Sequence, residues 1–162
     1  MEISNSRKKK TKYTIMKIAI TSDHAGFNLR KILIDHLKEN HQIKDFGPKT
    51  DDSCDYPDFV HPLCQKIKDF DFGILICGSA NGVSMTSNKY SDIRCAITWN
   101  KELSELARLH NDANCIAIPA RFVSVDMAKL MVDTFLSTQF EGGRHEKRVN
   151  KINKIKLEKS NS

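Results

Sequence analysis

Short apolar stretches alternate with segments of helical spacing along most of this chain, and this alternation constrains the fold more than any other feature. The apolar stretches are rich in β-branched residues and lie at Lys17–Thr21, Ile43–Phe46, Phe72–Cys77, Arg94–Thr98 and Cys115–Ile118. Alternating strands and helices form βαβ units, whose parallel sheet is covered by helices on both faces. We therefore predict a single doubly wound α/β domain, Rossmann-like, around a five-stranded parallel sheet.

The segments between these strands place apolar side chains three and four residues apart, as helices packed on a sheet do. They lie at Leu29–His36, Val60–Ile67, Leu103–His110 and Val125–Phe135. A last, charged helix is expected from about Gly143 to Leu157. The folded domain is expected to cover residues 16–157.

The net charge of +6 raises the question of nucleic-acid binding. Residues 1–15 carry five Lys or Arg against one Glu, and residues 144–162 carry seven against two, so the chain between them is mildly acidic. A nucleic-acid-binding protein usually spreads basic residues over a face of its folded body. We therefore predict solvated basic ends, with a disordered extension at 1–15 and a disordered tail at 158–162, and no nucleic-acid partner.

The remaining composition favours a cytoplasmic protein with free thiols. No apolar run approaches the roughly 20 residues that cross a bilayer, and no signal-like apolar stretch follows the basic start, so we expect no membrane contact. The five cysteines are odd in number and contain no CxxC pair, which argues against a disulfide framework and against a structural zinc site.

Parallel sheets bind ligands beyond the carboxyl ends of their strands, so the residues after each strand are the first candidates for function. The first strand leads into the segment 22–26, Ser-Asp-His-Ala-Gly. Asp23 and His24 could hold sugar hydroxyls and a phosphate, and Gly26 allows a tight turn into the following helix. Asp23 could equally serve only as a helix cap, and these five residues do not decide between the two interpretations.

The third strand ends in the segment 77–84, Cys-Gly-Ser-Ala-Asn-Gly-Val-Ser. Glycine and small residues ahead of a helix leave successive backbone N–H groups exposed, and such a nest binds anions. It could hold a phosphate or a developing enediolate. Cys77 stands at the edge of this nest, where oriented N–H groups favour a thiolate that can act as a base. The alternative is a small buried apolar residue, since free cysteine is among the most buried types.

Three further places contain basic residues that could take part in a site. The segment His110-Asn111-Asp112 ends a helix and contains one titratable base, although His110 also continues the apolar spacing of a core position. Arg121 follows the last strand. Arg144 and Arg148 share one face of the last helix, where two guanidinium groups suit a phosphate, or form a solvated surface pair.

These candidates together predict one kind of chemistry. A thiol base, an imidazole, an N–H nest and several arginines suit proton transfer beside the carbonyl of a small phosphorylated substrate. Redox and phosphoryl-transfer enzymes need other equipment, and the sequence contains neither a metal-ligand pattern nor a nucleotide-binding fingerprint. We predict an enzyme that uses no metal and no cofactor.

The same segments resemble the ribose-5-phosphate isomerase B / galactose-6-phosphate isomerase family over roughly residues 16–156. The matching stretches are Ser22–Gly26, Asp55–Pro57, Leu75–Ser79, Asn88–Lys89 before Ile93–Arg94, His110–Asp112 and Glu141–His145. The resemblance implies a homodimer, or a dimer of dimers, whose active site lies between subunits and interconverts ribose 5-phosphate and ribulose 5-phosphate.

The resemblance also implies a role for each candidate. Cys77 would move the proton between carbons 1 and 2, and Ser79 with the N–H groups of the segment Gly78–Gly82, Asn81 included, would steady the enediolate oxygen. His110 of the partner subunit would help to open the furanose ring. The sugar hydroxyls would contact Asp23, Tyr56 and Asn111, and the phosphate would contact His24, Arg121, Arg144 and Arg148.

Two departures and two alternatives accompany this resemblance. The nest usually has Gly where this chain has Ala80, so we expect Ala80 to keep an ordinary negative φ. The Lys-rich start before Met16 lies outside the family pattern. An isomerase of a six-carbon sugar phosphate, allose or galactose 6-phosphate, is the nearer alternative function. A non-catalytic α/β binding module that docks nucleic acid through its basic ends is the more distant one.

Overall fold

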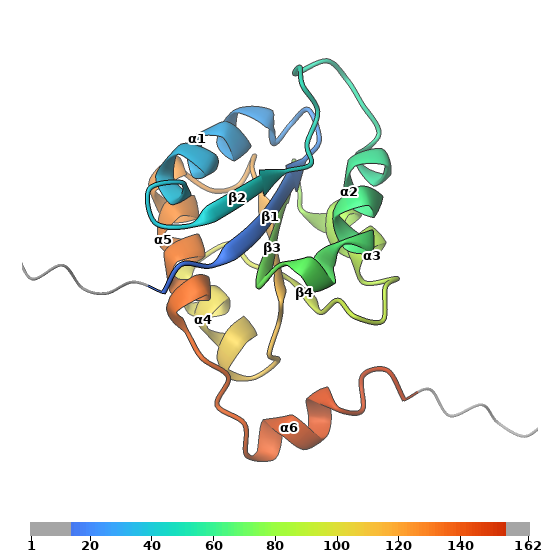
Figure 1. Cartoon of the computed structure of the whole chain (residues 1–162), viewed down its shortest axis with the longest axis vertical. Coiled ribbons are helices and arrows are strands. Elements are labelled where there is room, and N and C mark those ends of the chain that lie inside the picture. The colour runs from blue at the N-terminus through green and yellow to red at the C-terminus, as the bar shows by residue number, and fades with distance from the viewer. Residues whose placement is uncertain (1–13, 155–162) are drawn as a thin grey trace, which may run out of the picture.

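The computed structural model describes residues 14–154, and every structural statement below refers to that part of the chain. Five parallel strands form one sheet in the order β2-β1-β3-β5-β4 (Figure 1). The strands are β1 (Lys17–Ser22), β2 (Gln42–Asp45), β3 (Phe72–Cys77), β4 (Cys95–Ile97) and β5 (Cys115–Pro119). The predicted five-stranded parallel sheet is therefore confirmed, with strand ends that differ by one residue at most.

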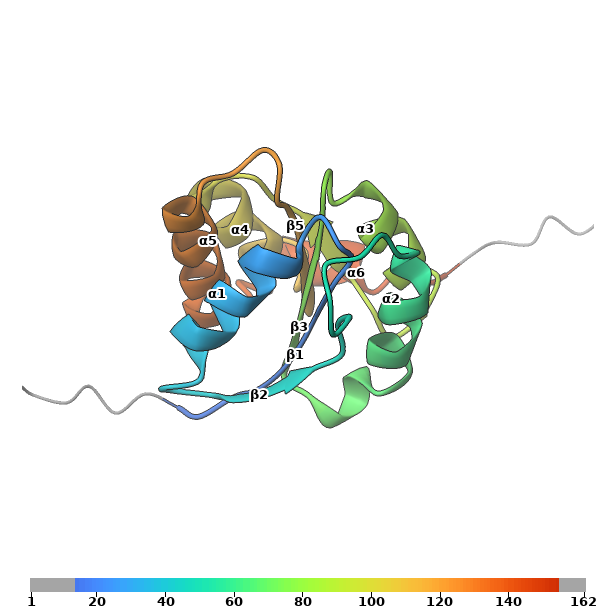
Figure 2. The same cartoon turned by 90° about the horizontal axis from the view of Figure 1, so that it is seen from above.

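Helices cover both faces of this sheet, as predicted. One layer contains α1 (Phe27–Leu37), α4 (Lys101–Leu109) and α5 (Val125–Ser137). The other contains α2 (Tyr56–Gln65), α3 (Asn81–Ser87) and the short 3₁₀ helix η1 (Ile67–Asp69). Figure 2 shows the two layers on either side of the sheet, with α6 (Arg144–Val149) apart from both.

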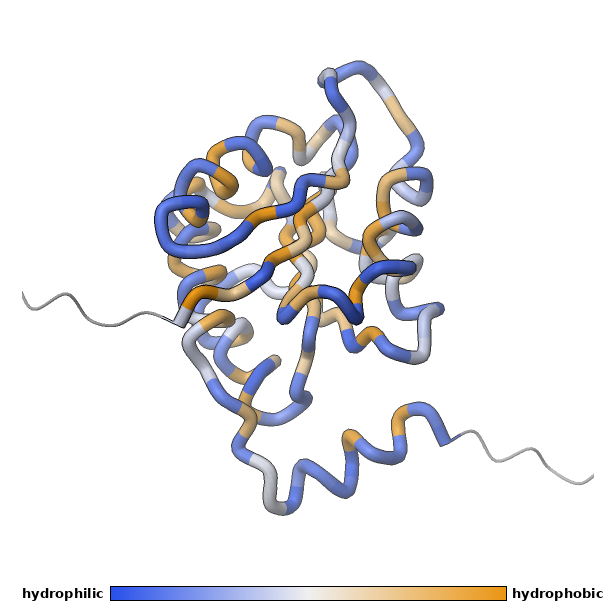
Figure 3. The backbone as a smooth tube through the Cα atoms, viewed as in Figure 1, coloured by the Kyte–Doolittle hydropathy of each residue, from blue (hydrophilic) through white to orange (hydrophobic). Residues whose placement is uncertain are grey.

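The alternation of side chains along the central strands explains why two layers are needed. In β3, Ile74 and Ile76 face the layer of α1 and α5, whereas Leu75 and Cys77 face α2 and α3. Both sets are buried, so these strands are apolar throughout, and each large aliphatic side chain contributes about 1.5–3 kcal/mol by burial. The edge strand β2 is mostly exposed and correspondingly polar. Figure 3 shows the apolar residues gathered along the sheet and the inner faces of the helices.

The strand order fixes where a ligand can bind. In the sheet, β2 lies on one side of the β1–β3 pair, and β4 and β5 lie on the other side. The strand order therefore reverses its direction between β1 and β3. In open α/β sheets, ligands bind at such a reversal, outside the carboxyl ends of the strands. The segments that follow β1 and β3 are the two that the sequence had already marked.

Gly26 is required at this reversal. It stands at the start of α1, and a Cβ there would lie 2.7 Å from Cγ2 and 2.8 Å from the carbonyl oxygen of Ile76. The backbone N–H of Asp23 donates to the same carbonyl at 3.2 Å. Only glycine lets the start of α1 approach β3 this closely.

Our expectation for Ala80 is wrong. It is the residue before α3 and adopts φ 65° and ψ −11°, which is the left-handed region. The turn from β3 into α3 requires this conformation, because the Ala80 carbonyl accepts the N–H of Ser84 at 3.1 Å and begins the helix. The methyl group of Ala80 is fully buried against the α2–α3 side of the core, and this burial offsets part of the strain.

Opposing contributions predict that Ala80→Gly is nearly neutral. Relief of the left-handed conformation gains about 1–2 kcal/mol, whereas loss of a buried methyl group costs roughly 0.8 kcal/mol and the added freedom of the unfolded chain about 0.4–1 kcal/mol. We expect the free energy of unfolding to change by less than about 1 kcal/mol, measured by urea titration at one fixed protein concentration. Ala80→Val, by contrast, should cost at least about 2 kcal/mol, because a β-branched side chain is poorly tolerated at positive φ and overpacks the core. A large gain in stability from Ala80→Gly would show that the strain is not offset.

The last helix is shorter than predicted. It ends at Val149, and residues 150–153 form turns instead of further helix. The helix ends here because the chain turns toward the loop that contains Ser91. The side-chain amide of Asn153 donates to the backbone oxygen of Ser91 at 2.7 Å. In Figure 1, α6 lies beyond the amino edge of the sheet, below α4.

The predicted outer boundaries lie mainly outside the described residues. Of the predicted extension 1–15, residues 1–13 lie outside, as do residues 155–157 of the predicted domain and the whole predicted tail 158–162. Within residues 14–154, no helix combines the length and the apolar character that a bilayer span requires.

Candidate active site

The predicted site residues fall into two groups at opposite edges of the sheet. The carboxyl-edge group lies at or just after the ends of β1, β3 and β5, in the first turn of α3, or at the start of α2. It contains Asp23, His24, Tyr56, Cys77, Gly78, Ser79, Asn81, Gly82 and Arg121. The amino-edge group lies at the end of α4 and on α6. It contains His110, Asn111, Arg144 and Arg148.

Cys77 is the last residue of β3 and retains 4 % exposure. Its carbonyl oxygen accepts the N–H of Ala120 at 2.9 Å, and that of Gly78 accepts the N–H of Arg121 at 3.2 Å. A Cβ on Gly78 would lie 3.2 Å from an Nη atom of Arg121, so the guanidinium group lies directly against this glycine. The fold therefore brings a cation from the end of β5 to the residue beside the thiol.

The segment 78–82, for which an N–H nest was predicted, forms the turn from β3 into α3, with Ala80 in the left-handed region. The Ser79 hydroxyl accepts the backbone N–H of Asn81 at 3.4 Å and its side-chain amide at 3.3 Å. A Cβ on Gly82 would lie 2.5 Å from Cζ of Tyr56, so the aromatic ring packs across the glycine. Tyr56, from the start of α2, is thereby held at the rim of the nest.

Asp23 and His24 take part in local hydrogen bonds as well. A carboxylate oxygen of Asp23 accepts the N–H of Gly26 at 3.0 Å and stabilises the turn before α1. The N-cap of α1 is Gly26, and no side chain caps this helix, so Asp23 is not its cap. Nδ1 of His24 accepts the N–H of Cys54 at 3.3 Å. A neutral His24 then carries its proton on Nε2, the nitrogen left for another partner.

The three buried cysteines other than Cys77 are unsuited to proton transfer. All five are free, as predicted. Burial raises the pKa of Cys64 to about 12 and that of Cys95 to about 11, and it raises the pKa of Cys115 well above the usual range. These three thiols stay protonated at neutral pH and serve as small apolar core residues. Cys77 is the cysteine that adjoins the nest.

At the amino edge, His110 stands at the end of α4 and stacks on His145 of α6, with ring centroids 4.1 Å apart and an interplanar angle of 13°. Nε of Arg144 donates to Nε2 of His145 at 3.4 Å. Desolvation, the neighbouring His110 and the cation Arg144 together lower the pKa of His145. Asn111 and Arg148 are exposed beside this pair.

Asp112 has a structural role in this region. Its carboxylate pairs with Arg94 at 3.1 Å and with Arg108 at 2.9 Å, and it adopts a positive φ of 44°. Both arginines also bind backbone oxygens, Arg94 that of Asp112 and Arg108 that of Ala113. This network fixes the turn between α4 and β5, and with it the position of His110.

One chain does not bring the two groups together. The turn after α4 leads into β5, whose first residue Cys115 lies beside Gly73 at the amino end of β3, whereas Cys77 lies at the carboxyl end. The four residue steps of strand from Gly73 to Cys77 correspond to roughly 13 Å. A site that uses both Cys77 and His110 therefore requires a second copy of the chain.

Sequence reasoning missed three residues that shape these regions. Arg30 is buried and donates to the Ser22 hydroxyl and the Pro48 carbonyl, both at 2.6 Å, which ties the end of β1 to the loop after β2. A single arginine among the apolar positions of the first helix was the available signal. Glu141 and His145 lie beside His110, and their spacing of four residues gave no sign of that contact.

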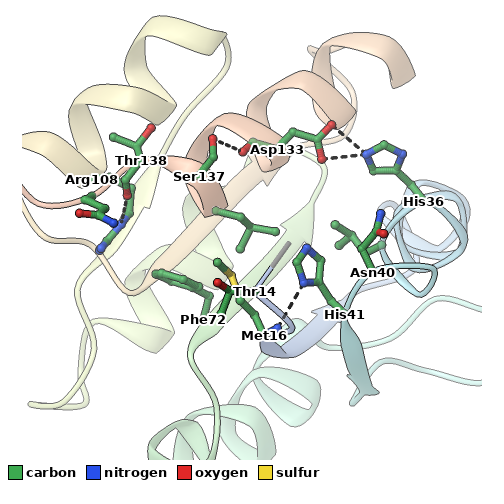
Figure 4. Close-up of a pocket in the computed structure, with 13 residues that line it drawn as sticks. Thr14, Met16, His36, Asn40, His41, Phe72, Arg108, Asp133, Ser137 and Thr138 are labelled. Carbon is green, nitrogen blue, oxygen red and sulfur yellow. Dashed lines mark hydrogen bonds and ion pairs between the residues drawn. The ribbon is translucent and has the colours of Figure 1, made fainter. Parts of the chain in front are cut away.

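A cavity of about 650 Å³ lies away from the carboxyl-edge group. Figure 4 shows its lining, where His36 of α1 pairs with Asp133 of α5 at 2.8 Å. His41, between α1 and β2, accepts the N–H of Met16 at 3.3 Å. None of the predicted site residues lines it.

Known proteins match this chain over nearly its whole described length. The sequence profile of the Ribose/Galactose Isomerase family matches residues 18–152. The chain belongs to this family. The probable ribose-5-phosphate isomerase B of Mycoplasma genitalium is 42 % identical over 147 residues, covering 88 % of this chain and 95 % of the relative. Ribose-5-phosphate isomerase B of Escherichia coli is 37 % identical over 142 residues, covering 86 % and 95 %.

Solved structures of this family share the fold. A ribose 5-phosphate isomerase from Thermotoga maritima superposes with a TM-score of 0.84 at 42 % identity, covering 86 % of this chain and 99 % of that one. Ribose-5-phosphate isomerase B from Mycoplasma genitalium, solved with bound ribulose-5-phosphate, gives a TM-score of 0.80 at 41 % identity, covering 84 % and 93 %.

Proposed function

We propose that this protein interconverts D-ribose 5-phosphate and D-ribulose 5-phosphate, with Cys77 as the base. The observation that carries the proposal is the position of Cys77 in a chain of the ribose/galactose isomerase family. It ends β3 at the reversal of winding, beside an N–H nest and the Arg121 guanidinium. Proton transfer through an enediolate needs a base that moves the proton and N–H donors that stabilise the negatively charged oxygen.

The reaction is an internal rearrangement. The Cys77 thiolate removes the proton from C2 of the open-chain aldose, and the electron pair forms the C1–C2 double bond while charge develops on O1. The N–H groups of residues 78–82 and the Ser79 hydroxyl stabilise that oxygen. The thiol then returns the proton to C1 while the hydroxyl proton moves from O2 to O1, so a ketone forms at C2. No external oxidant, reductant, metal or cofactor is consumed.

The complete site is built between two copies of the chain. His110 of the partner subunit acts on the ring oxygen to open the furanose, and Arg144 and Arg148 reach the phosphate from the amino edge. His24 and Arg121 meet the phosphate from the carboxyl edge. The separation of the two groups within one chain supports this arrangement, in a homodimer or a dimer of dimers.

The sugar hydroxyls have separate partners. Asp23, Tyr56 and Asn111 offer a carboxylate, a phenol and an amide for them. These groups orient the chain of the substrate so that C1 and C2 lie near the Cys77 sulfur. We place the reaction in the cytoplasm, and we assign no role to nucleic acid.

A coupled assay that compares three substrates tests the proposal. Ribose 5-phosphate should have the highest kcat/KM, and allose 6-phosphate and galactose 6-phosphate, each one carbon longer, should have lower values. The family description names both ribose and galactose, so a six-carbon sugar phosphate is the second candidate. A higher kcat/KM on either hexose phosphate would replace the pentose assignment, and no turnover of all three would contradict the isomerase.

Arg144→Ala should mainly weaken substrate binding. A guanidinium–phosphate contact is present in the ground state and in the transition state alike, so its loss raises KM more than it lowers kcat. We expect KM for ribose 5-phosphate to rise about 10- to 100-fold, from a charge-assisted hydrogen bond of about 1.5–3 kcal/mol. Lys147→Ala, which removes an exposed cation from the same helix, is the control and should leave KM within about twofold. An unchanged KM for Arg144→Ala would remove this residue from the site.

A further inference from the structure

Three potential metal ligands meet at the amino edge, and the proposed reaction uses only one of them. Nε2 of His110 lies 3.8 Å from a carboxylate oxygen of Glu141, and Nε2 of His145 lies 3.9 Å from the same oxygen. One ligand atom from each residue falls within 4.8 Å of the other two. We call these residues the His–Glu–His cluster.

The backbone holds the cluster together without help from its side chains. The N–H of His110 closes the last turn of α4 on the Leu106 carbonyl at 2.9 Å. The N–H of Glu141 donates to the Leu109 carbonyl at 3.1 Å, which ties the loop before α6 to the end of α4. The N–H of His145 donates to the Gly142 carbonyl at 3.1 Å. All three Cα atoms are thus positioned before any ligand arrives.

The ligand set fits a borderline-soft divalent cation. Two imidazoles and one carboxylate form a three-ligand zinc set that leaves the fourth position of a tetrahedron open. In such a tetrahedron, ligand atoms about 2.1 Å from the metal lie roughly 3.4 Å apart, so each His–Glu separation must close by about 0.5 Å. The side chains can move this far, since Glu141 is 58 % and His110 36 % exposed.

We propose that the His–Glu–His cluster binds one Zn²⁺ per chain and that the bound metal inhibits the enzyme. The two imidazole rings must splay from their parallel stack for both Nε2 atoms to face the metal. The contact from Arg144 Nε to His145 Nε2 must also break, because that lone pair becomes the metal ligand. The nearby guanidinium groups of Arg144 and Arg148 oppose a cation, so binding is weaker than at a four-ligand structural site.

The metal should inhibit the enzyme because its ligands include a group that the reaction uses. This inhibition rests on the proposed function. His110 is the ring-opening group, and its Nε2 is no longer free once a metal occupies it. Arg144, displaced from His145, loses the contact that orients it toward the phosphate. Zinc should therefore lower kcat and raise KM for ribose 5-phosphate at the same metal concentration.

Metal binding is tested without substrate. Titration of the full-length protein with Co²⁺ should give the visible absorption bands of a tetrahedral nitrogen–oxygen site, saturating at one metal per chain, and Zn²⁺ should displace it. Glu141→Gln should weaken binding at least about 10-fold, because a neutral amide is a poor ligand for this metal. Glu146→Gln, which removes an equal charge from the exposed side of α6, is the matched control and should bind as the unmodified protein does.

A second variant separates the cluster from the thiol at the other edge. Cys77 is also a ligand for zinc, so the titration is repeated with Cys77→Ala. Retention of the one-metal stoichiometry in Cys77→Ala, with its loss in Glu141→Gln, supports the cluster. Loss of binding in Cys77→Ala, or equal binding in Glu141→Gln and Glu146→Gln, overturns it.

Activity measurements then test the inhibition. Glu141→Gln should keep basal activity within about threefold and resist zinc concentrations that inhibit both the unmodified enzyme and Glu146→Gln. If the metal binds as described but activity is unaffected, the inhibitory role is wrong while the site stands. A protein that binds the metal but turns over no sugar phosphate contradicts the proposed function and leaves the metal site intact.

Discussion

Cys77→Ala should lower kcat for ribose 5-phosphate by about 100- to 10,000-fold while the variant still binds the sugar phosphate. The thiolate acts on a proton that moves in the transition state, so its loss removes little of the ground-state binding. The phosphate and hydroxyl contacts remain in place. Steady-state kinetics gives kcat, and calorimetric titration with ribulose 5-phosphate gives the dissociation constant, which should stay within about fivefold.

Cys64→Ala is the matched control for this prediction. Cys64 is buried in the same apolar cluster as Cys77, and its raised pKa keeps it protonated. Both substitutions remove one sulfur from that cluster, so both should cost a similar free energy of unfolding of about 1 kcal/mol. Only Cys77→Ala should lose turnover. A Cys77→Ala enzyme that keeps more than about a tenth of its kcat would show that another group is the base.

The sheet was predictable from this sequence because each central strand is apolar on both faces. Ile74, Leu75 and Ile76 leave no polar side of β3, and only a sheet covered by two helical layers buries such a strand. The same pattern located the carboxyl-edge residues, since a loop between a buried strand and a helix must lie at that edge of a parallel sheet.

Features that depend on contacts between distant segments were not predictable. The positive φ of Ala80 follows from the turn that connects β3 to α3. A side chain is unfavourable at positive φ, and burial of the Ala80 methyl group in the core offsets part of that cost. The early end of α6 depends on the hydrogen bond from Asn153 to Ser91, sixty-two residues away. The meeting of His110 and Glu141 depends on the backbone bond to Leu109.

The division of the candidate site into two groups has an explanation in the direction of the chain. A helix that follows a parallel strand runs back along the sheet, so its last residue lies at the opposite edge from the strand's end. α4 leaves the carboxyl edge after β4 and carries His110 to the amino edge. The motif of residues 110–112 therefore cannot contact Cys77 of the same chain, although the family resemblance assigns both to one reaction.

Mixing two inactive variants should restore activity if each site combines two chains. Cys77→Ala supplies an intact His110, and His110→Ala supplies an intact Cys77. In a heterodimer of the two, one site contains both substitutions and the other contains none. Random exchange places half of the chains in heterodimers, each with one of its two sites intact, so about a quarter of the unmodified activity should return.

The complementation is measured with the variants carrying different affinity tags and expressed together, and the heterodimer is isolated through both tags. Isolated heterodimer should have about half of the unmodified kcat per dimer, because one of its two sites is intact. A double variant carrying Cys77→Ala and His110→Ala, paired with the unmodified chain, provides the comparison: each of its two sites lacks one group, so it should show almost no activity. If the first heterodimer is inactive and the second keeps half the unmodified rate, then Cys77 and His110 of one chain act in the same site, and the division of the site between two subunits is wrong.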